Sequence, residues 1–324
     1  MGIMVQGKWT QQDFAKRNEK GSYIRPTTAF RNFIGDEDFP AVAGRYHLVV
    51  AHACPWAHRT LIFRALKGLE EVISVAYVEP LMLENGWVLM DGGDPVTGAK
   101  YTYQIYAQAV PDYSGRCSVP VLWDKEARTI VNNESSDIIR MFNSAFDALA
   151  TKSPPDMYPE DLRAEIDAVN ELVYENINNG VYRTGFATTQ AAYEASFNNV
   201  FDALDRMEAR LDSRRYLTGP RITEADWRLF ATLVRFDAVY VGHFKCNRQR
   251  IADFPNLSNY LRELYQWPGI AGTVDIPRTK EHYYGSHDAV NPFGIVPVGP
   301  ELDFDSPHDR EHLPSTVQGG GNGV

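Results

Sequence analysis

The sequence is poor in cysteine and has no apolar run long enough to cross a bilayer. Its three cysteines, Cys54, Cys117 and Cys246, lie far apart, which argues against a disulfide scaffold and suits the reducing cytosol. A membrane span needs roughly 20 consecutive apolar residues. The first residues, MGIMVQGKWT, also lack the apolar core and cleavage site of a signal peptide. We therefore expect a cytoplasmic protein without a membrane partner.

The sequence also has fewer basic than acidic residues. The 32 Lys and Arg residues face 42 Asp and Glu residues, a net charge of −10, so nucleic acid is not expected as a partner. His52 and His58 flank Cys54, but no other His or Cys follows them at metal-ligand spacing, and we expect no metal. With 44% hydrophobic and 23% charged residues, the 324-residue chain is long enough for two folded domains.

A redox motif of the C-x-x-C type is missing too, because Cys54 in A-C-P-W-A-H-R-T is followed three places later by Ala57. Redox chemistry at Cys54 would use a single sulfur and take its second thiol from elsewhere. Cys54 stands between a predicted strand and a helix that begins at Pro55, where backbone N–H groups and the helix dipole favour an anion. A thiol there can become a ready nucleophile. The alternative is a buried structural cysteine, which we expect for Cys117 and Cys246.

The first half of the chain predicts a small mixed α/β sheet. Residues 46–51 and 72–78 read as strands on either side of a helix that Gly68 ends, which implies a parallel pair. A long loop follows over residues 79–118, then a hairpin of strands 119–123 and 129–132 and a helix from Ser135. We place an irregular N-terminal extension at residues 1–44 and this domain at residues 45–150.

The second half is helical almost throughout. After Ser153-Pro154-Pro155, which resembles a linker, the clearest helices cover residues 162–177, 190–211, 225–239 and 257–265. These predict an all-α domain over residues 156–275. A tail follows over residues 276–324, with disorder at its end in residues 318–324.

Two dipeptides in the first domain could hold a peptide. Pro120 begins a strand, and a cis Val119-Pro120 bond would leave the Val119 backbone for an added peptide strand. The dipeptide alone favours trans, because only about 5–6% of X–Pro bonds are cis. Glu134-Ser135 begins a helix; Ser135 is either a cap or a holder of a ligand carboxylate, with Glu134 facing an ammonium. Together these features suit a peptide with a free amino-acid end and a sulfur near Cys54.

This order of elements resembles the glutathione transferase superfamily. Val119-Pro120 matches its cis-proline, Glu134-Ser135 its γ-glutamyl-binding pair, and Thr223-Glu-Ala-Asp226 its C-terminal capping box. The resemblance implies an α/β thioredoxin-like N-terminal domain plus an all-α C-terminal domain.

A more specific resemblance runs from residue 8 to residue 299. C-P-W-A-H-R-T, P-L-M-L-E-N-G-W, S-V-P-V-L-W-D-K, N-E-S-S-D-I-I-R-M-F-N and N-N-G-V-Y-R-T-G-F are similar to stretches of the glutathionyl-hydroquinone reductases, or Xi-class transferases. This likeness implies a homodimer that uses glutathione as co-substrate on glutathionylated aromatic hydroquinones. Cys54 would take the glutathionyl group as a mixed disulfide, and a second glutathione would release glutathione disulfide.

The resemblance also implies site residues. Tyr182 and Tyr283 would be catalytic and substrate-binding, and the tail carrying Tyr283 would contribute to a substrate cleft between the domains. The residues implied in glutathione binding are Trp87, Arg116, Val119, Pro120, Glu134 and Ser135. His282 and Arg183 are weaker substrate-binding candidates.

Three other readings stay open at this point. An omega-type thioltransferase or dehydroascorbate reductase would use the same Cys54 with another acceptor. A glutathione-binding module without catalysis is a second alternative, although Cys54 is intact. A conjugating transferase would need a hydroxyl where Cys54 stands, because a thiol there would trap glutathione as a disulfide.

Overall fold

The computed structural model describes residues 2–11, 17–25 and 27–316, which divide into two compact units. The first unit contains the described residues up to 154, apart from 17–25, together with residues 277–286. The second unit contains residues 17–25, 155–276 and the described residues from 287 onward. The disorder expected for residues 318–324 concerns a segment outside the described residues. None of the helices in the described ranges is both long and apolar enough to span a membrane.

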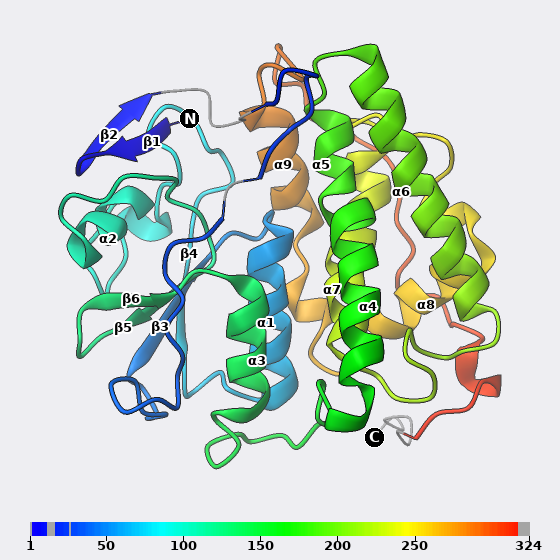
Figure 1. The fold of residues 1–324 in the computed structure, drawn as a ribbon, viewed down its shortest axis with the longest axis horizontal. Coiled ribbons are helices and arrows are strands. Elements are labelled where there is room, and N and C mark those ends of the chain that lie inside the picture. Colours follow the sequence, from blue (N-terminus) through cyan, green and yellow to red (C-terminus); the bar gives the residue numbers. More distant parts are fainter. Residues whose placement is uncertain (1, 12–16, 26, 317–324) are drawn as a thin grey trace. The chain divides into compact units, whose positions relative to one another are not determined.

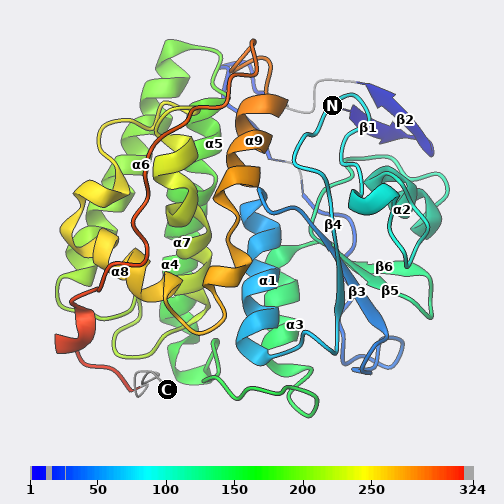
Figure 2. The ribbon, with the colours of Figure 1, turned by 180° about the vertical axis from the view of Figure 1, so that it is seen from behind.

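A four-stranded mixed sheet forms the centre of the first unit, in the order β4-β3-β5-β6. Its strands are β3 (Tyr46–Val50), β4 (Ser74–Tyr77), β5 (Val121–Asp124) and β6 (Thr129–Asn132). Strand β3 runs parallel to β4, whereas β5 is antiparallel to both of its neighbours. Helices α1 (Pro55–Lys67) and α3 (Ser135–Ser144) cover one face, and α2 (Thr102–Ala109) lies on the other (Figures 1 and 2). The mixed sheet and its helices confirm the predicted thioredoxin-like architecture.

Burial explains why these segments take their places. All five residues of β3 are buried, as expected for a central strand covered on both faces. Helix α1 ends where Gly68 adopts φ 62°, a left-handed conformation that favours glycine. On α3 the residues Ile138 and Phe142 are fully buried, and their spacing gives the helix its apolar stripe.

Two segments predicted to be irregular contain regular structure. The N-terminal extension forms a hairpin of β1 (Gly2–Val5) and β2 (Lys8–Gln11), joined where Gln6 and Gly7 both have positive φ, as a two-residue hairpin turn requires. The predicted loop over residues 79–118 contains α2 and a 3₁₀ turn at Met90–Gly92. Both predictions were wrong because the strands have four residues each and α2 only eight, too short for a clear periodicity.

The second unit is built from helices, as predicted. They are α4 (Arg163–Val173), α5 (Gly180–Gly185), α6 (Gln190–Leu211), α7 (Glu224–Arg235) and α8 (Pro255–Tyr265). One π-helical turn, Tyr174–Asn178, continues α4, and another, Phe236–Tyr240, continues α7. The prediction for residues 190–211 matches α6 at both ends, whereas the short α5 was not predicted.

The predicted capping box of α7 is present and is fully buried. Asp226 accepts a hydrogen bond from the Thr223 backbone N–H at 2.8 Å, which closes the box. The same carboxylate accepts from the Leu217 N–H at 2.8 Å and from the Tyr260 hydroxyl at 2.7 Å. Burial raises the pKa of Asp226 to about 6, although these hydrogen bonds oppose the shift. Asp226 therefore ties α7 to α8, a folding role as the sequence suggests.

One further helix connects distant parts of the chain. Helix α9 (Ile276–Ser286) begins at the residue where the expected tail begins, and residues 277–286 of it belong to the first unit. Both ribbon views place α9 beyond the N-terminal end of α1 (Figures 1 and 2). The Thr279 hydroxyl donates to the His52 carbonyl at 3.5 Å, which joins α9 to the segment just before α1.

Candidate functional site

Sheet topology brings the sequence-predicted peptide-binding residues to one edge. Strands β3 and β6 both run opposite to β5. The carboxyl ends of β3 and β6 and the start of β5 therefore form one edge of the sheet. Cys54, which follows β3, and Glu134, which follows β6, lie at this edge, next to Val119 and Pro120. The N-termini of α1 and α3 are at that edge too, because each helix starts directly after its strand. An anion or an extended peptide would meet several backbone N–H groups there.

Cys54 occupies the N-cap of α1, with φ −75° and ψ 114°. Cys54 is a partly exposed residue, and its thiol donates to the Val119 carbonyl oxygen at 3.5 Å. Pro55 follows at the first helical position. The Cys54 carbonyl accepts the His58 N–H at 2.9 Å, so the residue is part of the first helical turn. Cys54 thus presents its sulfur at the start of a helix, a position at which the helix dipole favours an anion.

Of the other two cysteines, Cys117 is partly exposed and Cys246 is buried. Burial raises the pKa of the Cys117 thiol far above its usual range, and burial raises the pKa of Cys246 to about 12. Both side chains therefore stay protonated near neutral pH, and neither is a ready nucleophile. The burial of Cys246 agrees with the structural cysteine expected from the sequence, whereas Cys117 is partly exposed.

The Val119-Pro120 peptide bond is cis. The expectation from the dipeptide alone was trans and is wrong, whereas the expectation from the family resemblance is confirmed. Both residues are buried, and β5 begins immediately after them.

Glu134, rather than Ser135, caps α3. The Glu134 carboxylate accepts from the backbone N–H and the hydroxyl of Ser136, each at 3.2 Å, and from the Thr28 hydroxyl at 3.3 Å. Ser135 is the first helical residue and is buried, with its hydroxyl 3.5 Å from the Glu134 carboxylate. The possibility that Ser135 is the cap is therefore wrong, and both residues stay at the sheet edge that holds Cys54.

Trp87 lies in the connection between β4 and α2, and it is 8% exposed. Its carbonyl accepts the Thr102 N–H at 3.0 Å, and its indole stacks on the His282 imidazole with ring centres 4.8 Å apart. Arg116 is partly exposed, and its carbonyl accepts the Tyr113 hydroxyl at 3.1 Å. Trp87 is therefore fixed through both its backbone and its ring, whereas Arg116 is partly exposed to solvent.

His282 and Tyr283 are neighbours on α9 and both are buried, at 6% and 1% exposure. The His282 Nδ1 donates to the Pro80 carbonyl at 2.8 Å. Burial lowers the pKa of His282 to about 4, and the Pro80 hydrogen bond only partly offsets this shift. His282 is thus neutral near pH 7, with its proton on Nδ1. Sequence periodicity does not single out either residue, because both stand in a segment that reads as a tail.

Tyr182 and Arg183 lie on α5 in the second unit. The Tyr182 ring packs against an aromatic cluster, with ring centres 5.4 Å from Phe244 and 6.2 Å from Tyr240. The Arg183 guanidinium donates to the Glu175 carboxylate at 2.6 Å and to the Glu175 carbonyl at 3.2 Å. Arg183 therefore has a partner on its own helical segment, and the role of either side chain toward a substrate stays a prediction.

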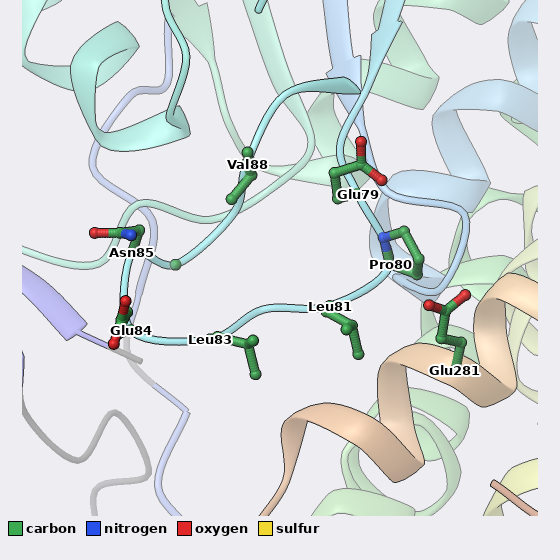
Figure 3. A pocket seen from close by; sticks show the side chains of 9 residues that line it. Glu79, Pro80, Leu81, Leu83, Glu84, Asn85, Val88 and Glu281 are labelled. Atoms are coloured by element: carbon green, nitrogen blue, oxygen red, sulfur yellow. The ribbon is translucent and has the colours of Figure 1, made fainter. Parts of the chain in front are cut away.

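Sequence reasoning missed a pocket of about 330 Å³ in the first unit (Figure 3). Its lining consists of Glu79, Pro80, Leu81, Leu83, Glu84, Asn85, Gly86 and Val88 from one loop and Glu281 from α9. Three carboxylic acids surround an apolar floor, so a ligand with a net negative charge is disfavoured there. The pocket was not foreseeable because Glu281 is distant in sequence. Within the described ranges no group of three or more His, Cys, Asp or Glu side chains could hold a metal ion.

Comparison with known proteins gives one consistent relationship. The family models for the N-terminal and C-terminal domains of glutathione S-transferases match residues 53–145 and 190–263. The glutathionyl-hydroquinone reductase YqjG of Escherichia coli K12 is 50% identical, over 96% of this chain and 99% of its own. The glutathionyl-hydroquinone reductase PcpF of Sphingobium chlorophenolicum is 53% identical, over 93% and 96%.

Solved structures agree with the sequence comparisons. The glutathione-bound structure of YqjG has a TM-score of 0.87 and covers 95% of this chain and 99% of its own. A Xi-class transferase from Natrialba magadii, 47% identical, has a TM-score of 0.90 and covers 97% and 98%. The chain belongs to the glutathione S-transferase superfamily, and within it to the family of the glutathionyl-hydroquinone reductases and Xi-class transferases.

Proposed function

We propose that this protein is a glutathionyl-hydroquinone reductase, which uses glutathione to remove the glutathionyl group from S-glutathionylated aromatic hydroquinones. The observation that carries the proposal is the place of the partly exposed residue Cys54 at the N-cap of α1, with its sulfur 3.5 Å from the Val119 carbonyl oxygen. Two relatives that match this chain almost end to end bear this name. A solved structure of one of them holds glutathione, which supports glutathione as the co-substrate.

Glutathione binds, in this proposal, along the sheet edge at the N-termini of α1 and α3. Its γ-glutamyl end carries an ammonium and a carboxylate, which Glu134 and Ser135 would receive. Val119 would pair with its backbone as an added strand does, beside the cis Pro120. Trp87 and Arg116 would contact the remainder of the tripeptide, with the Arg116 guanidinium suited to a carboxylate. The acidic pocket in Figure 3 is unsuited to it, because glutathione is itself anionic.

The first chemical step transfers the glutathionyl group to Cys54. The Cys54 thiolate attacks the sulfur that links glutathione to the aromatic ring, so an S–S bond forms as the aryl C–S bond breaks. The electron pair of the broken bond stays on the ring carbon, which takes a proton. Tyr182 and Tyr283 are the proposed acids, because a phenol is neutral near pH 7 and can also bind a hydroquinone oxygen.

The second step restores Cys54. The thiolate of a second glutathione attacks the glutathionyl sulfur of the mixed disulfide, which releases the Cys54 thiolate and glutathione disulfide. In sum, the aromatic carbon is reduced by two electrons, while the thioether sulfur of the substrate and the thiol of a second glutathione are oxidised to one disulfide. The missing C-x-x-C partner of Cys54 fits this scheme, since the resolving thiol is supplied by the co-substrate.

A steady-state assay with glutathione and a panel of S-glutathionylated hydroquinones tests the proposal. Wild-type protein is expected to release free hydroquinone and glutathione disulfide in equal amounts, and Cys54→Ser is expected to fall to the uncatalysed rate. Cys117→Ser is the matched control and should keep its activity. Full turnover by Cys54→Ser would overturn the mechanism. Reduction of dehydroascorbate or of small glutathione disulfides, with no reaction on any hydroquinone, would identify an omega-type enzyme instead.

The proposal includes a homodimer located in the cytoplasm, in line with the family resemblance and with the sparse cysteines. Sedimentation equilibrium of the purified protein tests the first point, with a mass twice that of the chain as the expected result. Cell fractionation tests the second.

A further inference from the structure

Helix α9 is attached to the loop that carries Trp87 through two hydrogen bonds. The His282 Nδ1 donates to the Pro80 carbonyl at 2.8 Å, and the Ser286 hydroxyl accepts the Met82 N–H at 2.9 Å. His282 and Ser286 are four residues apart, so they share one face of the helix. The Ser286 hydroxyl oxygen lies 3.4 Å from the His282 Nδ1. The start of the loop is thereby fixed by a helix about 200 residues further along the chain.

Close packing supports the same arrangement. An added Cβ at Gly285 would lie 2.6 Å from the Leu81 side chain, so the helix and the loop approach each other as closely as glycine permits. At the loop's own base, the Glu79 N–H donates to the Val88 carbonyl at 2.7 Å. In Figure 3 the loop from Glu79 to Val88 turns back on itself beside the α9 segment that bears Glu281. The loop and α9 therefore form one packed element.

The ring of His282 then meets the ring of Trp87. Their centres are 4.8 Å apart and their planes are inclined by 24°, a stacked geometry in which the imidazole supports one face of the indole. Both side chains are more than nine-tenths buried. An indole supported on one face and fixed at its backbone has little freedom to rotate, which preorganises it for a ligand.

We propose that His282 is a positioning residue that acts through Trp87, holding the indole in the orientation that glutathione binding requires. This role differs from the substrate contact that family resemblance suggests for it. The inference rests on the proposed function only in taking glutathione as the ligand of Trp87. Because Tyr283 follows His282 on the same helix, α9 also fixes one proposed substrate residue relative to the glutathione site.

Binding measurements on substituted proteins separate positioning from direct contact. Glutathione affinity is measured by calorimetry on the full chain with Cys54→Ser, which prevents disulfide formation. His282→Ala removes both the ring and the donor, and we expect the dissociation constant to rise about tenfold, equivalent to about 1.4 kcal/mol. His282→Phe keeps a ring but no donor, and His282→Asn keeps a donor near the Nδ1 position but no ring. Each of these two is expected to retain part of the affinity.

A double-mutant cycle gives the decisive comparison. In a Trp87→Ala background, His282→Ala should weaken glutathione binding no further, because His282 acts through the indole. Glu281→Gln, one residue away on α9, is the matched control and should bind as wild type does. Equal losses with and without Trp87, or no loss from His282→Ala, would overturn the proposal. If His282→Ala does not fold, the Phe and Asn variants are compared across the same cycle.

The double-mutant cycle measures glutathione affinity and therefore does not depend on whether the protein turns over a hydroquinone. Wild-type protein that binds glutathione but reduces no hydroquinone would contradict the proposed function, while the cycle would still decide the role of His282. Wild-type protein that does not bind glutathione would overturn both.

Discussion

The thiol of Cys54 donates to the carbonyl oxygen of Val119 at 3.5 Å, and Val119 is the residue before a cis proline. This contact joins the N-cap of α1 to the edge of the sheet where β5 begins. A sulfur in that position lies beside backbone that an extended peptide can use as a strand partner. This geometry is what the proposed exchange between Cys54 and the thiol of a bound tripeptide would need.

Cys54 should form a mixed disulfide with glutathione without help from another cysteine. Mixing wild-type protein with glutathione disulfide is expected to add one glutathionyl group per chain, because a thiolate at a helix N-terminus attacks disulfides readily. Intact-mass spectrometry followed by peptide mapping measures the adduct and locates it. Cys246→Ser should be modified as wild type is. An adduct on Cys117, or none at all, would contradict the assignment of Cys54.

The charge of Glu134 should matter for glutathione more than for folding. Glu134→Gln keeps an oxygen that can cap α3 but removes the negative charge proposed to face the γ-glutamyl ammonium. We expect the dissociation constant for glutathione to rise about tenfold, equivalent to about 1.4 kcal/mol, with the melting temperature nearly unchanged. Calorimetry and thermal unfolding measure the two effects. A fall in melting temperature with unaltered affinity would show that Glu134 is only a cap.

The two proposed substrate tyrosines should be needed for aromatic substrates and not for thiol exchange. The double variant Tyr182→Phe, Tyr283→Phe removes two hydroxyls, and we expect turnover of glutathionylated hydroquinones to fall by roughly 10²-fold or more, as loss of general acids does. Exchange with a small glutathione mixed disulfide needs no proton on carbon and should be largely spared. Steady-state rates for both substrates give the comparison. Equal losses would argue against an acid role.

A buried carboxylate in the first unit should make stability depend on acidic pH. The Asp94 Oδ1 lies 3.0 Å from the His47 Nε2. Burial alone would raise the pKa of Asp94, but hydrogen bonds from His47 and Thr97 outweigh burial and lower this pKa to about 2. A depressed carboxyl pKa stabilises the fold above the ordinary value near 3.8, and this stabilisation is lost as the pH falls through about 2.

Asp94→Asn should therefore lower the free energy of unfolding at neutral pH by about 1–2 kcal/mol. The difference from wild type should shrink in acid as Asp94 itself becomes protonated. Urea unfolding at several pH values measures it, with Asp91→Asn, an exposed aspartate nearby, as the control. A difference that stays constant down to pH 2 would show that ionisation of Asp94 is not the cause.

Local patterns were sufficient to predict most of the elements. The strand before Cys54, the helix after it and the helix over residues 190–211 are clear because apolar spacing, Pro55 and Gly68 act within a few residues of one another. The position of Cys54 at a helix start was predictable for the same reason. Short elements such as α2 and the β1–β2 hairpin have too few residues to show a period.

What the sequence by itself determined is the order of strands and helices, the capping box at Thr223 and the place of Cys54 at a helix start. Only the tertiary structure decided that Glu134 rather than Ser135 caps α3 and that α9 packs beside the loop of Trp87. Local signals depend on neighbours within a turn or a strand. Contacts such as the stacking of His282 on Trp87 depend on burial between segments about 200 residues apart, which no spacing rule encodes.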